Sequence, residues 1–396
     1  MRILLITNMW IGINDFFFKG KEDISGMPAF YNVFIRLLYS NKVEKVFIIT
    51  FVNSKHQKIF IPEKFKNKIE VYPFFFRSKI DLLTKSFLAS ILSLFLILSK
   101  RINIISGHGA IGFIAGIVSI FSGIPNIRRI YGSFLINEIE SSKLTLFVKH
   151  PFEYLTFSLP AKAIIITNDG THGDIVYHKI GNKNAKLFFL MNSRPSNNYS
   201  DAQLEKVSQL NLPEKYISYI ARIDEWKRQH LLLEALHSLT RENIYIPAII
   251  IGPIFNADYY NKICDFININ FPPKMIRIIP GLPRPLVYQV LKESVFTLSL
   301  YDTSNLGNVF LESLTSGTPI IGLNNNNSLS DFPDRIYYSI RVDYIETIAE
   351  AIKKLWFDIK LQEQLSSLSM DFAHKILLTE DKRAKIEIDL LIEYMK

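Results

Sequence analysis

The sequence predicts an α/β protein of two domains, each built around a doubly wound parallel sheet with helices on both faces. Short β-branched runs alternate with segments of helical periodicity along the whole chain, which is the pattern of parallel α/β layers. The alternation restarts after a polar segment at residues 193–215, the predicted linker. A length of 396 residues also exceeds what one ordinary hydrophobic core accommodates.

The first domain is predicted to span residues 1–195. Its apolar runs indicate strands at residues 2–8, 45–52, 102–106, 127–132 and 161–167. Its periodic segments indicate helices at residues 28–39, 82–100, 110–121 and 144–155.

The second domain is predicted to span residues 196–375 and repeats the same pattern. Strands are expected at residues 216–221, 246–252, 275–281, 295–300 and 319–323, with helices between them. A helix pair at residues 361–375 and 381–394 ends the chain. The sequence leaves open whether the C-terminal helix, within residues 376–396, returns to the first domain.

Composition limits the class of protein. The single cysteine, Cys264, excludes a disulfide framework and a cysteine-based metal site, and it favours a reducing cytoplasm. The first residues, MRILLITN, have the pattern of a first strand and not of a signal peptide. The longest apolar run, residues 87–98, includes serines and is shorter than the roughly 20 residues that span a bilayer. A cytoplasmic protein without a transmembrane helix is expected, either soluble or peripheral on the inner membrane face.

Charge is unevenly distributed along the chain. Residues 1–200 contain 25 Lys and Arg against 12 Asp and Glu, whereas residues 201–396 contain 21 against 25, which together give the net charge of +9. A basic first half favours an anionic partner there, such as membrane lipid, a phosphorylated acceptor or nucleic acid. The alternative is a solvated basic surface. Two phenylalanine triplets, Phe16–Phe18 and Phe74–Phe76, either insert at a membrane surface or pack in the core.

Residues 301–323, YDTSNLGNVFLESLTSGTPIIGL, connect a predicted strand to a helix. The small residues of this connection, Ser304, Asn305, Leu306, Gly307 and Asn308, expose backbone N–H groups at the helix N-terminus, where the dipole favours phosphate. Glu312 lies one turn further and suits hydrogen bonds to the hydroxyls of a ribose. The alternative is an ordinary capped helix that stops at Gly317 before a proline.

Two cations flank the turn after the first strand of the second half. Arg222 ends that strand and Lys227 begins the next helix, so both are able to converge on one diphosphate. A lysine at a helix N-terminus is unfavourable unless an anion lies there. The alternative is a local pair of Arg222 with Asp224 or Glu225 and a solvated lysine.

Gly107–Gly112 fits G-x-G-x-x-G between a strand and a helix, and therefore raises a dinucleotide site. No acid follows at the usual distance, but the arginines of RRIYG are compatible with a 2′-phosphate, so an NADP site stays open. The other interpretation is close helix packing by the glycines, with His108 at the mouth of a cleft.

Near the N-terminus, Gly26 precedes a helix-starting proline and allows a ligand to approach the backbone. The sequence contains no D-x-D, H-E-x-x-H or P-loop motif, so no bound metal is expected.

Together these segments resemble the retaining glycosyltransferases of family 4. The family's G-R-x-x-x-x-K-G is similar to residues 221–228, its l-i-G-x-G-p to IIIGPIF with Gly252, and its v-x-f-x-G to IRIIPGL. Its signature of two glutamates separated by seven residues ends at Glu312. The resemblance is strongest over residues 216–323.

The resemblance implies the GT-B fold, two facing Rossmann-like domains with a cleft between them, and it implies roles for residues. Arg222 and Lys227 would hold the donor diphosphate, Glu312 the ribose, and the main chain at Gly281 and Leu282 the base. Amides from Gly307 to Val309 would cradle phosphate. The sequence departs from the family at three places: Ser304 replaces the first glutamate of the signature, Tyr131 replaces a histidine that faces the sugar or acceptor, and Ser193 follows Asn192 where a glycine is usual.

The implied activity is transfer of a sugar from UDP-sugar or GDP-sugar to a glycan or lipid-linked oligosaccharide, with retention, without a cofactor or metal, and without a nucleic-acid partner. Bacterial surface polysaccharide synthesis, such as O-antigen or capsule, is the expected setting. Two alternatives remain open from the residues: a GT-B nucleotide-sugar epimerase, and a non-catalytic nucleotide-sugar-binding module.

Overall fold

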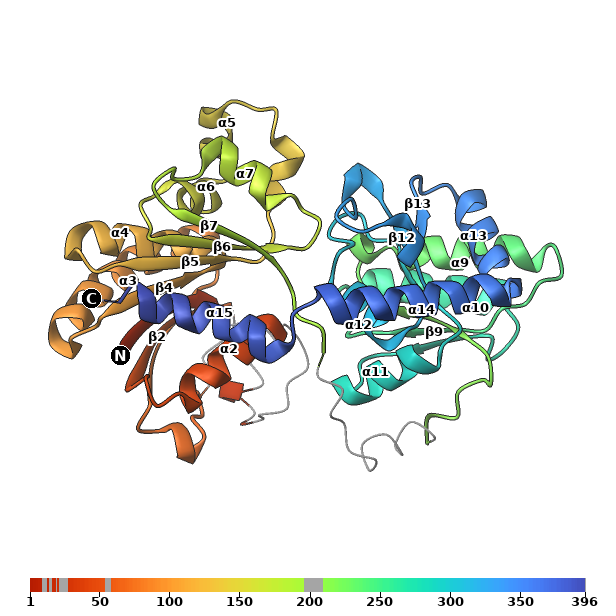
Figure 1. Cartoon of the computed structure of the whole chain (residues 1–396), viewed down its shortest axis with the longest axis horizontal. Helices are drawn as coiled ribbons and strands as arrows, with labels where there is room; N and C mark the ends of the chain where they lie inside the picture. The colour runs from red at the N-terminus through yellow and green to blue at the C-terminus, as the bar shows by residue number, and fades with distance from the viewer. Residues whose placement is uncertain are drawn as a thin grey trace. The chain divides into compact units, whose positions relative to one another are not determined.

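The computed structural model describes residues 1–8, 13, 16–18, 20, 28–53, 58–195 and 209–395. The chain divides into two compact units (Figure 1). Unit 1 contains Met1–Met191 together with Glu380–Lys396, and unit 2 contains Asn192–Thr379. The predicted Gly26 lies outside the described residues, and most of the predicted linker does as well.

Unit 1 is built on a seven-stranded parallel sheet in the order β3-β2-β1-β4-β5-β6-β7. Its strands are β1 (Arg2–Asn8), β2 (Lys45–Val52), β3 (Ile69–Phe75), β4 (Ile104–His108), β5 (Asn126–Ile130), β6 (Ala163–Asn168) and β7 (Lys186–Met191). The order reverses between β1 and β4, which creates the switch point of a doubly wound sheet. Strands β1, β4, β5 and β6 are buried along nearly their whole length, as expected for parallel strands that are covered on both faces.

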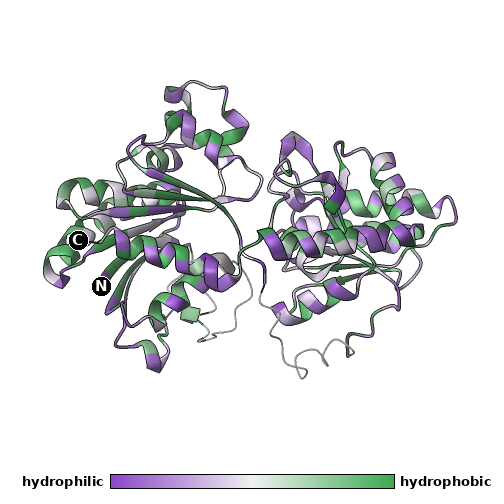
Figure 2. Ribbon diagram, viewed as in Figure 1, coloured by the Kyte–Doolittle hydropathy of each residue, from purple (hydrophilic) through white to green (hydrophobic). Residues whose placement is uncertain are grey.

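Helices cover both faces of this sheet. They are α2 (Pro28–Tyr39), α3 (Lys79–Lys100), α4 (Phe113–Ser122), α5 (Lys143–Lys149), α6 (Pro151–Ser158), α7 (Gly173–Ile180) and α15 (Glu380–Glu393). One core cluster joins α2 and α15 to the sheet, and another joins α3 and α4 to it. Hydrophobic and hydrophilic residues alternate along α15, as in a helix that buries one face (Figure 2).

Unit 2 has a six-stranded parallel sheet in the order β10-β9-β8-β11-β12-β13. Its strands are β8 (Ile217–Ile220), β9 (Ala248–Ile251), β10 (Ile276–Ile279), β11 (Thr297–Ser299), β12 (Ile320–Leu323) and β13 (Tyr338–Ile340). Its helices are α9 (Gln229–Thr240), α10 (Ala257–Asn270), α11 (Arg284–Glu293), α12 (Asn308–Ser316), α13 (Ile345–Phe357) and α14 (Ile359–Ile376). The predicted class, two doubly wound parallel sheets, is confirmed.

Several elements differ from the prediction. The segment predicted as one helix at residues 144–155 forms two, α5 and α6, because Pro151 starts α6 and keeps His150 out of the helical region, at φ −131° and ψ 56°. Strands β3, β7 and β13 were not predicted. All three are edge strands, and β3 tolerates Pro73 because an edge strand need not donate every N–H to a neighbour.

Helix α3 is longer than predicted. Within the described residues, α3 is long and apolar enough to cross a membrane, judged by length and composition alone. Its mean hydropathy is 2.0, and 28% of the apolar stretch is buried inside unit 1. The expectation that no segment reaches such a length was wrong. The residues that interrupt its apolar run are serines, which a helix accommodates by bonding the hydroxyl to its own backbone.

Strand β5 contains two fully buried arginines. Arg128 donates from Nη1 to the carbonyl oxygen of Leu155 at 3.1 Å and to that of Thr156, at the C-terminal end of α6, where the helix dipole favours a cation. The Nε of Arg129 lies 2.9 Å from the Glu387 carboxylate of α15. Both guanidinium groups are therefore committed inside the protein, and an NADP site built on them is excluded.

Candidate functional site

The predicted donor residues of unit 2 follow its strands at one edge of the sheet. Arg222 follows β8, Gly252 follows β9, Gly281 follows β10, and Ser304 lies in the connection after β11. Since all these strands are parallel, their carboxyl ends share an edge, which is where doubly wound sheets bind ligands.

Arg222 is fixed by an acid and two aromatic rings. Its Nε pairs with the carboxylate of Asp224, and its guanidinium carbon lies 4.7 Å from the Phe255 ring centroid and 5.1 Å from that of Trp226. The local pair with Asp224, weighed as the alternative, is thus present. About a third of the Arg222 side chain remains exposed, so the group is held in place and still accessible.

Lys227 lies against the same tryptophan. Its Nζ is 4.9 Å from the Trp226 centroid and 3.7 Å from that of Tyr301, a buried residue. Cations gain electrostatic stabilisation over aromatic faces without losing their charge. The structure therefore brings Arg222 and Lys227 together through one shared ring.

Arg228 was not predicted, although it stands at the final glycine of the G-R-x-x-x-x-K-G motif. It has φ +53°, a left-handed conformation that explains a glycine in the family. Its guanidinium pairs with Asp302 and with Asp343, each at 2.8 Å. The loop is tied again by Trp226, whose Nε1 donates to the Thr303 hydroxyl at 2.9 Å. These contacts join the loop after β8 to the loop after β11.

Within the β11–α12 connection, Asn305 shapes the loop. Its fully buried amide accepts from Tyr301 N–H at 2.9 Å and from the Ser299 hydroxyl at 3.0 Å, and it donates to the Tyr301 carbonyl at 2.8 Å. Leu306 is buried as well. A donor contact from Asn305 or Leu306 would therefore have to come from the main chain, because their side chains face the protein interior.

The N-terminus of α12 has the geometry of an anion site. Gly307 is its N-cap in an extended conformation and provides no side-chain cap. The N–H groups of the first helical turn have no acceptor within the helix and carry partial positive charge. Asn308 accepts at its Oδ1 from Asn192 at 2.8 Å, so its side chain is oriented by the segment that follows unit 1.

Glu312 lies one turn into α12 with 8% exposure. Its carboxylate is 3.6 Å from the guanidinium of Arg284, which starts α11 directly after Leu282 and Pro283. An ionised carboxylate accepts up to about four hydrogen bonds, so this ion pair is compatible with a ribose diol. Arg284 was missed by the sequence analysis, because nothing in a single sequence pairs it with a residue 28 positions away.

The two predicted glycines serve different purposes. A Cβ at Gly252 would lie 1.8 Å from the carbonyl oxygen of Ala221, so this position admits only glycine next to the neighbouring loop. A Cβ at Gly281 would meet nothing within 4 Å, but φ is +100°, which favours glycine. Leu282 and Val309, the predicted base and phosphate contacts, both pack at the edge of one core cluster.

His108 does not lie at the mouth of a cleft. It is buried at the end of β4, its Nε2 lies 2.9 Å from the Ser106 hydroxyl and its Nδ1 lies 2.8 Å from the Tyr131 hydroxyl. Burial, and secondarily the charge of Arg129, lowers the pKa of His108 to about 3, so the imidazole is neutral. Its predicted exposure is wrong because the strand extends to His108 itself.

Tyr131, predicted as a sugar-facing residue, is half-buried and its ring lies 4.7 Å from the Arg129 guanidinium carbon. The nearby glycines serve packing: a Cβ at Gly107 would lie 2.7 Å from that of Ala115. Close approach of helix and strand is therefore the role of G-x-G-x-x-G here.

The phenylalanine triplets pack against unit 1 to different degrees. Phe16 and Phe17 are fully buried, and Phe74 stacks on Phe51 with centroids 5.7 Å apart. Phe16 and Phe17 are therefore not available for insertion in a membrane, whereas Phe18 and Phe74–Phe76 are only partly buried.

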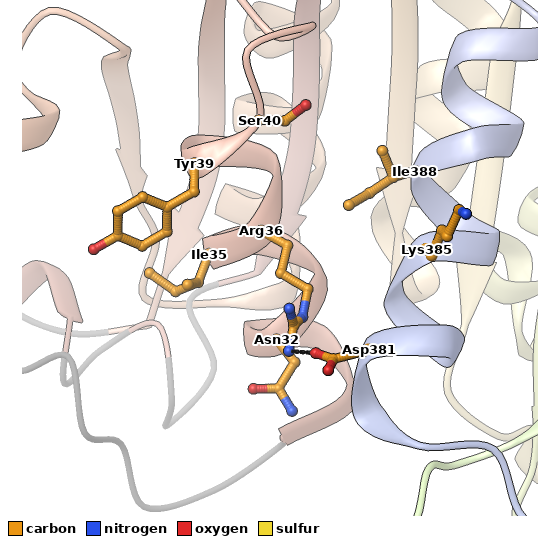
Figure 3. Close-up of a pocket in the computed structure, with 8 residues that line it drawn as sticks. All are labelled: Asn32, Ile35, Arg36, Tyr39, Ser40, Asp381, Lys385 and Ile388. Atoms are coloured by element: carbon orange, nitrogen blue, oxygen red, sulfur yellow. Dashed lines mark ion pairs between the residues drawn. The ribbon is translucent and has the colours of Figure 1, made fainter. Parts of the chain in front are cut away.

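A surface pocket of about 530 Å³ lies between α2 and α15 (Figure 3). Arg36 of α2 points toward Asp381 of α15 and forms an ion pair with it (Figure 3). None of the predicted site residues lines this pocket. In the part of the chain that the structure describes, no group of three or more His, Cys, Asp or Glu could hold a metal ion.

Comparison with known proteins finds a similarity over the second unit. Residues 200–368 match the family model of glycosyl transferases group 1. The match covers less than half of the 396 residues and lies within unit 2. A search of curated protein sequences found no match.

Solved structures of glycosyltransferases and related proteins match nearly the whole chain. HepE of Anabaena, in complex with UDP and glucose, has a TM-score of 0.70 and 14% identity, over 99% of this chain and 100% of that one. Sucrose-phosphate synthase from Thermosynechococcus elongatus has a TM-score of 0.70 and 13% identity, over 99% of this chain and 98% of that one. WaaG, a glycosyltransferase involved in lipopolysaccharide biosynthesis, has a TM-score of 0.65 and 12% identity, over 98% of this chain and 99% of that one. At these identities the likeness shows the fold, and it is GT-B, as predicted.

Proposed function

We propose that the protein transfers a sugar from a nucleotide-diphosphate sugar to a glycan or lipid-linked acceptor, with retention at the anomeric carbon. The observation that carries this proposal is the placement of Arg222 and Lys227 over one Trp226 ring, at the strand edge to which the uncapped α12 also belongs. Two cations and a helix N-terminus at one edge suit a diphosphate. The HepE structures, which were solved with UDP and with UDP-glucose, support a uridine nucleotide.

In this mechanism the site acts mainly through charge. As the bond between the anomeric carbon and the donor phosphate breaks, negative charge grows on the leaving diphosphate, and Arg222 and Lys227 stabilise it. Such preorganised electrostatic stabilisation is usually the largest contribution to catalysis. Glu312 would hold the ribose, and Gly281 and Leu282 the base. The proposal assigns deprotonation of the acceptor hydroxyl to the leaving phosphate, which lies on the face that the acceptor attacks.

The setting proposed is synthesis of a bacterial surface polysaccharide by a cytoplasmic enzyme. The involvement of WaaG in lipopolysaccharide biosynthesis supports it. The rivals are an epimerase and a non-catalytic nucleotide-sugar-binding module, the latter favoured by Ser304 and Tyr131, which stand where the resembled family has Glu and His.

The test is incubation of the protein with UDP-sugars and GDP-sugars, with and without a lipid-linked glycan acceptor. Acceptor-dependent release of nucleoside diphosphate supports the proposal. Epimerised sugar without acceptor would support the first rival, and a raised melting temperature without turnover would support the second.

Arg222→Ala and Lys227→Ala should each lower kcat/KM by about 100-fold or more, because each removes a charge-assisted interaction with the diphosphate in a water-poor site. The exposed Lys292→Ala on α11 is the control and should leave kcat/KM unchanged. Normal turnover in both variants would contradict the diphosphate assignment.

A further inference from the structure

One side of α3 presents large apolar side chains to the outside of unit 1. They recur at intervals of three or four residues, which places them in a single stripe along the helix. The stripe comprises Ile80, Leu83, Phe87, Ile91, Phe95 and Leu98. Phe87 is 67% exposed, Phe95 63% and Leu98 83%. A surface helix of a globular protein normally shows the opposite pattern, with polar residues outside.

The opposite side of α3 contains several small residues. Ser86, Ala89 and Ser93 are buried where the helix packs in unit 1, and Leu96 and Ile97 complete its buried face. The bulky residues of the stripe lie on the other side of the helix and project outward. This packing also holds α3 in unit 1, so the helix is not free to cross a bilayer.

The stripe continues onto α4. Ile120 and Phe121 of that helix are exposed, and a groove of about 570 Å³ runs between α3 and α4. Its apolar lining includes Leu83, Phe87, Ile91, Phe113, Ile117 and Phe121. Contiguous exposed apolar surface of this kind marks a binding surface for membrane or protein.

The hydroxyl groups on α3 favour lipid over a protein partner. Thr84 donates to the Ile80 carbonyl at 3.2 Å, Ser90 to Ser86 at 2.9 Å and Ser99 to Phe95 at 2.8 Å. A protein interface uses about one hydrogen bond per 100–200 Å². Hydroxyls that donate to their own helix contribute few hydrogen bonds to a protein partner. In an apolar medium, where every polar group needs a hydrogen-bond partner within the protein, such hydroxyls are already satisfied.

The charges near α3 favour an anionic surface. Residues 77–101 contain Arg77, Lys79, Lys85, Lys100 and Arg101 against one acid, Asp81. No charge occurs between Lys85 and Lys100, and Lys100 itself lies 3.4 Å from Glu70. An apolar stripe with basic residues at both ends is typical of helices that lie in a lipid interface, where long basic side chains reach the headgroups.

We propose that the exposed face of α3 and α4 docks on an anionic lipid bilayer, with α3 lying in the plane of the interface. Phe87, Phe95 and Leu98 insert among the acyl chains, and the basic residues at the ends of α3 contact the headgroups. This surface belongs to unit 1 and uses none of the donor-site residues. It therefore stands independently of the proposed transfer reaction.

The test is sedimentation of the full-length protein with vesicles of phosphatidylcholine containing about one third phosphatidylglycerol, without donor or acceptor. Wild type should bind them at least tenfold more strongly than pure phosphatidylcholine vesicles at low salt, and salt of about 0.5 M should release part of it. The double variant Phe87→Ser, Phe95→Ser should lower the partition coefficient tenfold or more, since two exposed rings no longer enter lipid. Both residues are exposed, so folding should be retained.

The matched control replaces exposed apolar residues of unit 2, Phe357→Ser with Ile376→Ser, and should bind as wild type does. A second readout is depth: a tryptophan from Phe95→Trp should be quenched by brominated acyl chains, and one from Phe357→Trp should not. Absence of vesicle binding by wild type, or equal binding by both double variants, would overturn the proposal. So would light scattering that shows a dimer which Phe87→Ser, Phe95→Ser dissociates, because the face would then join two copies of the chain.

Discussion

Trp226 organises the candidate site at the scale of single residues. Both predicted cations lie over its ring, and its indole N–H reaches the next loop at Thr303. The sequence places Arg222 and Lys227 five residues apart across a strand–helix turn, so their proximity was predictable from local geometry. The contacts of Arg228 with Asp302 and Asp343 were not, because those acids lie 74 and 115 residues further along the chain.

Glu312 is predicted to bind the ribose of the donor. Glu312→Gln should weaken binding of the preferred nucleoside diphosphate about tenfold, the scale of one hydrogen bond to a charged group. Binding of the 2′,3′-dideoxy analogue should be unchanged by the substitution, because that ligand lacks the diol. Calorimetry of both ligands measures the difference, with the exposed Glu293→Gln as control. An equal loss for both ligands would assign Glu312 to the packing of α12 through Arg284.

His108 should make stability depend on pH. Its pKa is about 3 in the folded protein against 6.5 ordinarily, so between these values the unfolded chain binds the extra proton and stability rises with pH. The contribution present at pH 7.5 falls by about 2 kcal/mol at pH 5. Urea unfolding measures the change in the free energy of unfolding between the two pH values. This change should be smaller than in wild type by about that amount in His108→Gln, and the same as in wild type in the exposed control His178→Gln. An unchanged difference in His108→Gln would show that the histidine titrates normally.

At the scale of elements, α15 is the helix whose place depends most on tertiary contacts. It follows unit 2 in sequence yet packs in the core of unit 1, and Arg383 donates from Nε to the Met191 carbonyl at 3.0 Å. Glu387 pairs there with Arg129 at 2.9 Å and Arg383 at 2.6 Å. Burial is the main cause that lowers the pKa of Arg383, and Glu387 opposes it.

Glu387→Gln should therefore destabilise unit 1 strongly. It leaves two buried guanidinium groups without their carboxylate, at a cost of about 3–5 kcal/mol. Chemical denaturation followed by circular dichroism should show the loss. Asp389→Asn, on the exposed side of the same helix, should change the midpoint little. Equal midpoints for the two variants would mean that the buried pair contributes nothing to holding α15.

At the scale of the whole molecule, the chain combines two parallel sheets, a proposed donor site in unit 2 and an excess of basic residues in its first half. The diphosphate partners assigned in unit 2 are cationic side chains and backbone amides. In the proposed mechanism they would supply the charge that a divalent metal supplies in enzymes with acidic motifs.

Transfer should accordingly withstand chelation. Excess EDTA is expected to leave the rate of nucleoside diphosphate release unchanged within about twofold, whereas Lys227→Ala lowers it severely. The measurement is the initial rate with and without EDTA, followed by addition of manganese. Activity that EDTA abolishes and manganese restores would replace the cation mechanism by a metal-assisted one.

The sequence by itself determined what depends on neighbouring residues. Periodicity decided the buried strands, the restart of the pattern decided the two sheets, and short motifs decided where Arg222, Lys227 and the N-terminus of α12 lie, because each of these depends on a span of at most a few turns. Three of the four edge strands in the described residues, β3, β7 and β13, escaped prediction, whereas β10 was predicted.

Only the tertiary structure decided which side chains are buried or exposed against that pattern. Arg128 and Arg129 in an apolar strand, the neutral buried His108 and the α15 anchor depend on partners far along the chain, and no single segment encodes them. The outward stripe of α3 follows the same rule in reverse: its residues are as apolar as a core, but they lie opposite the side of the helix that packs in unit 1. Burial is a property of what packs against a residue, and that is settled only when the chain has folded.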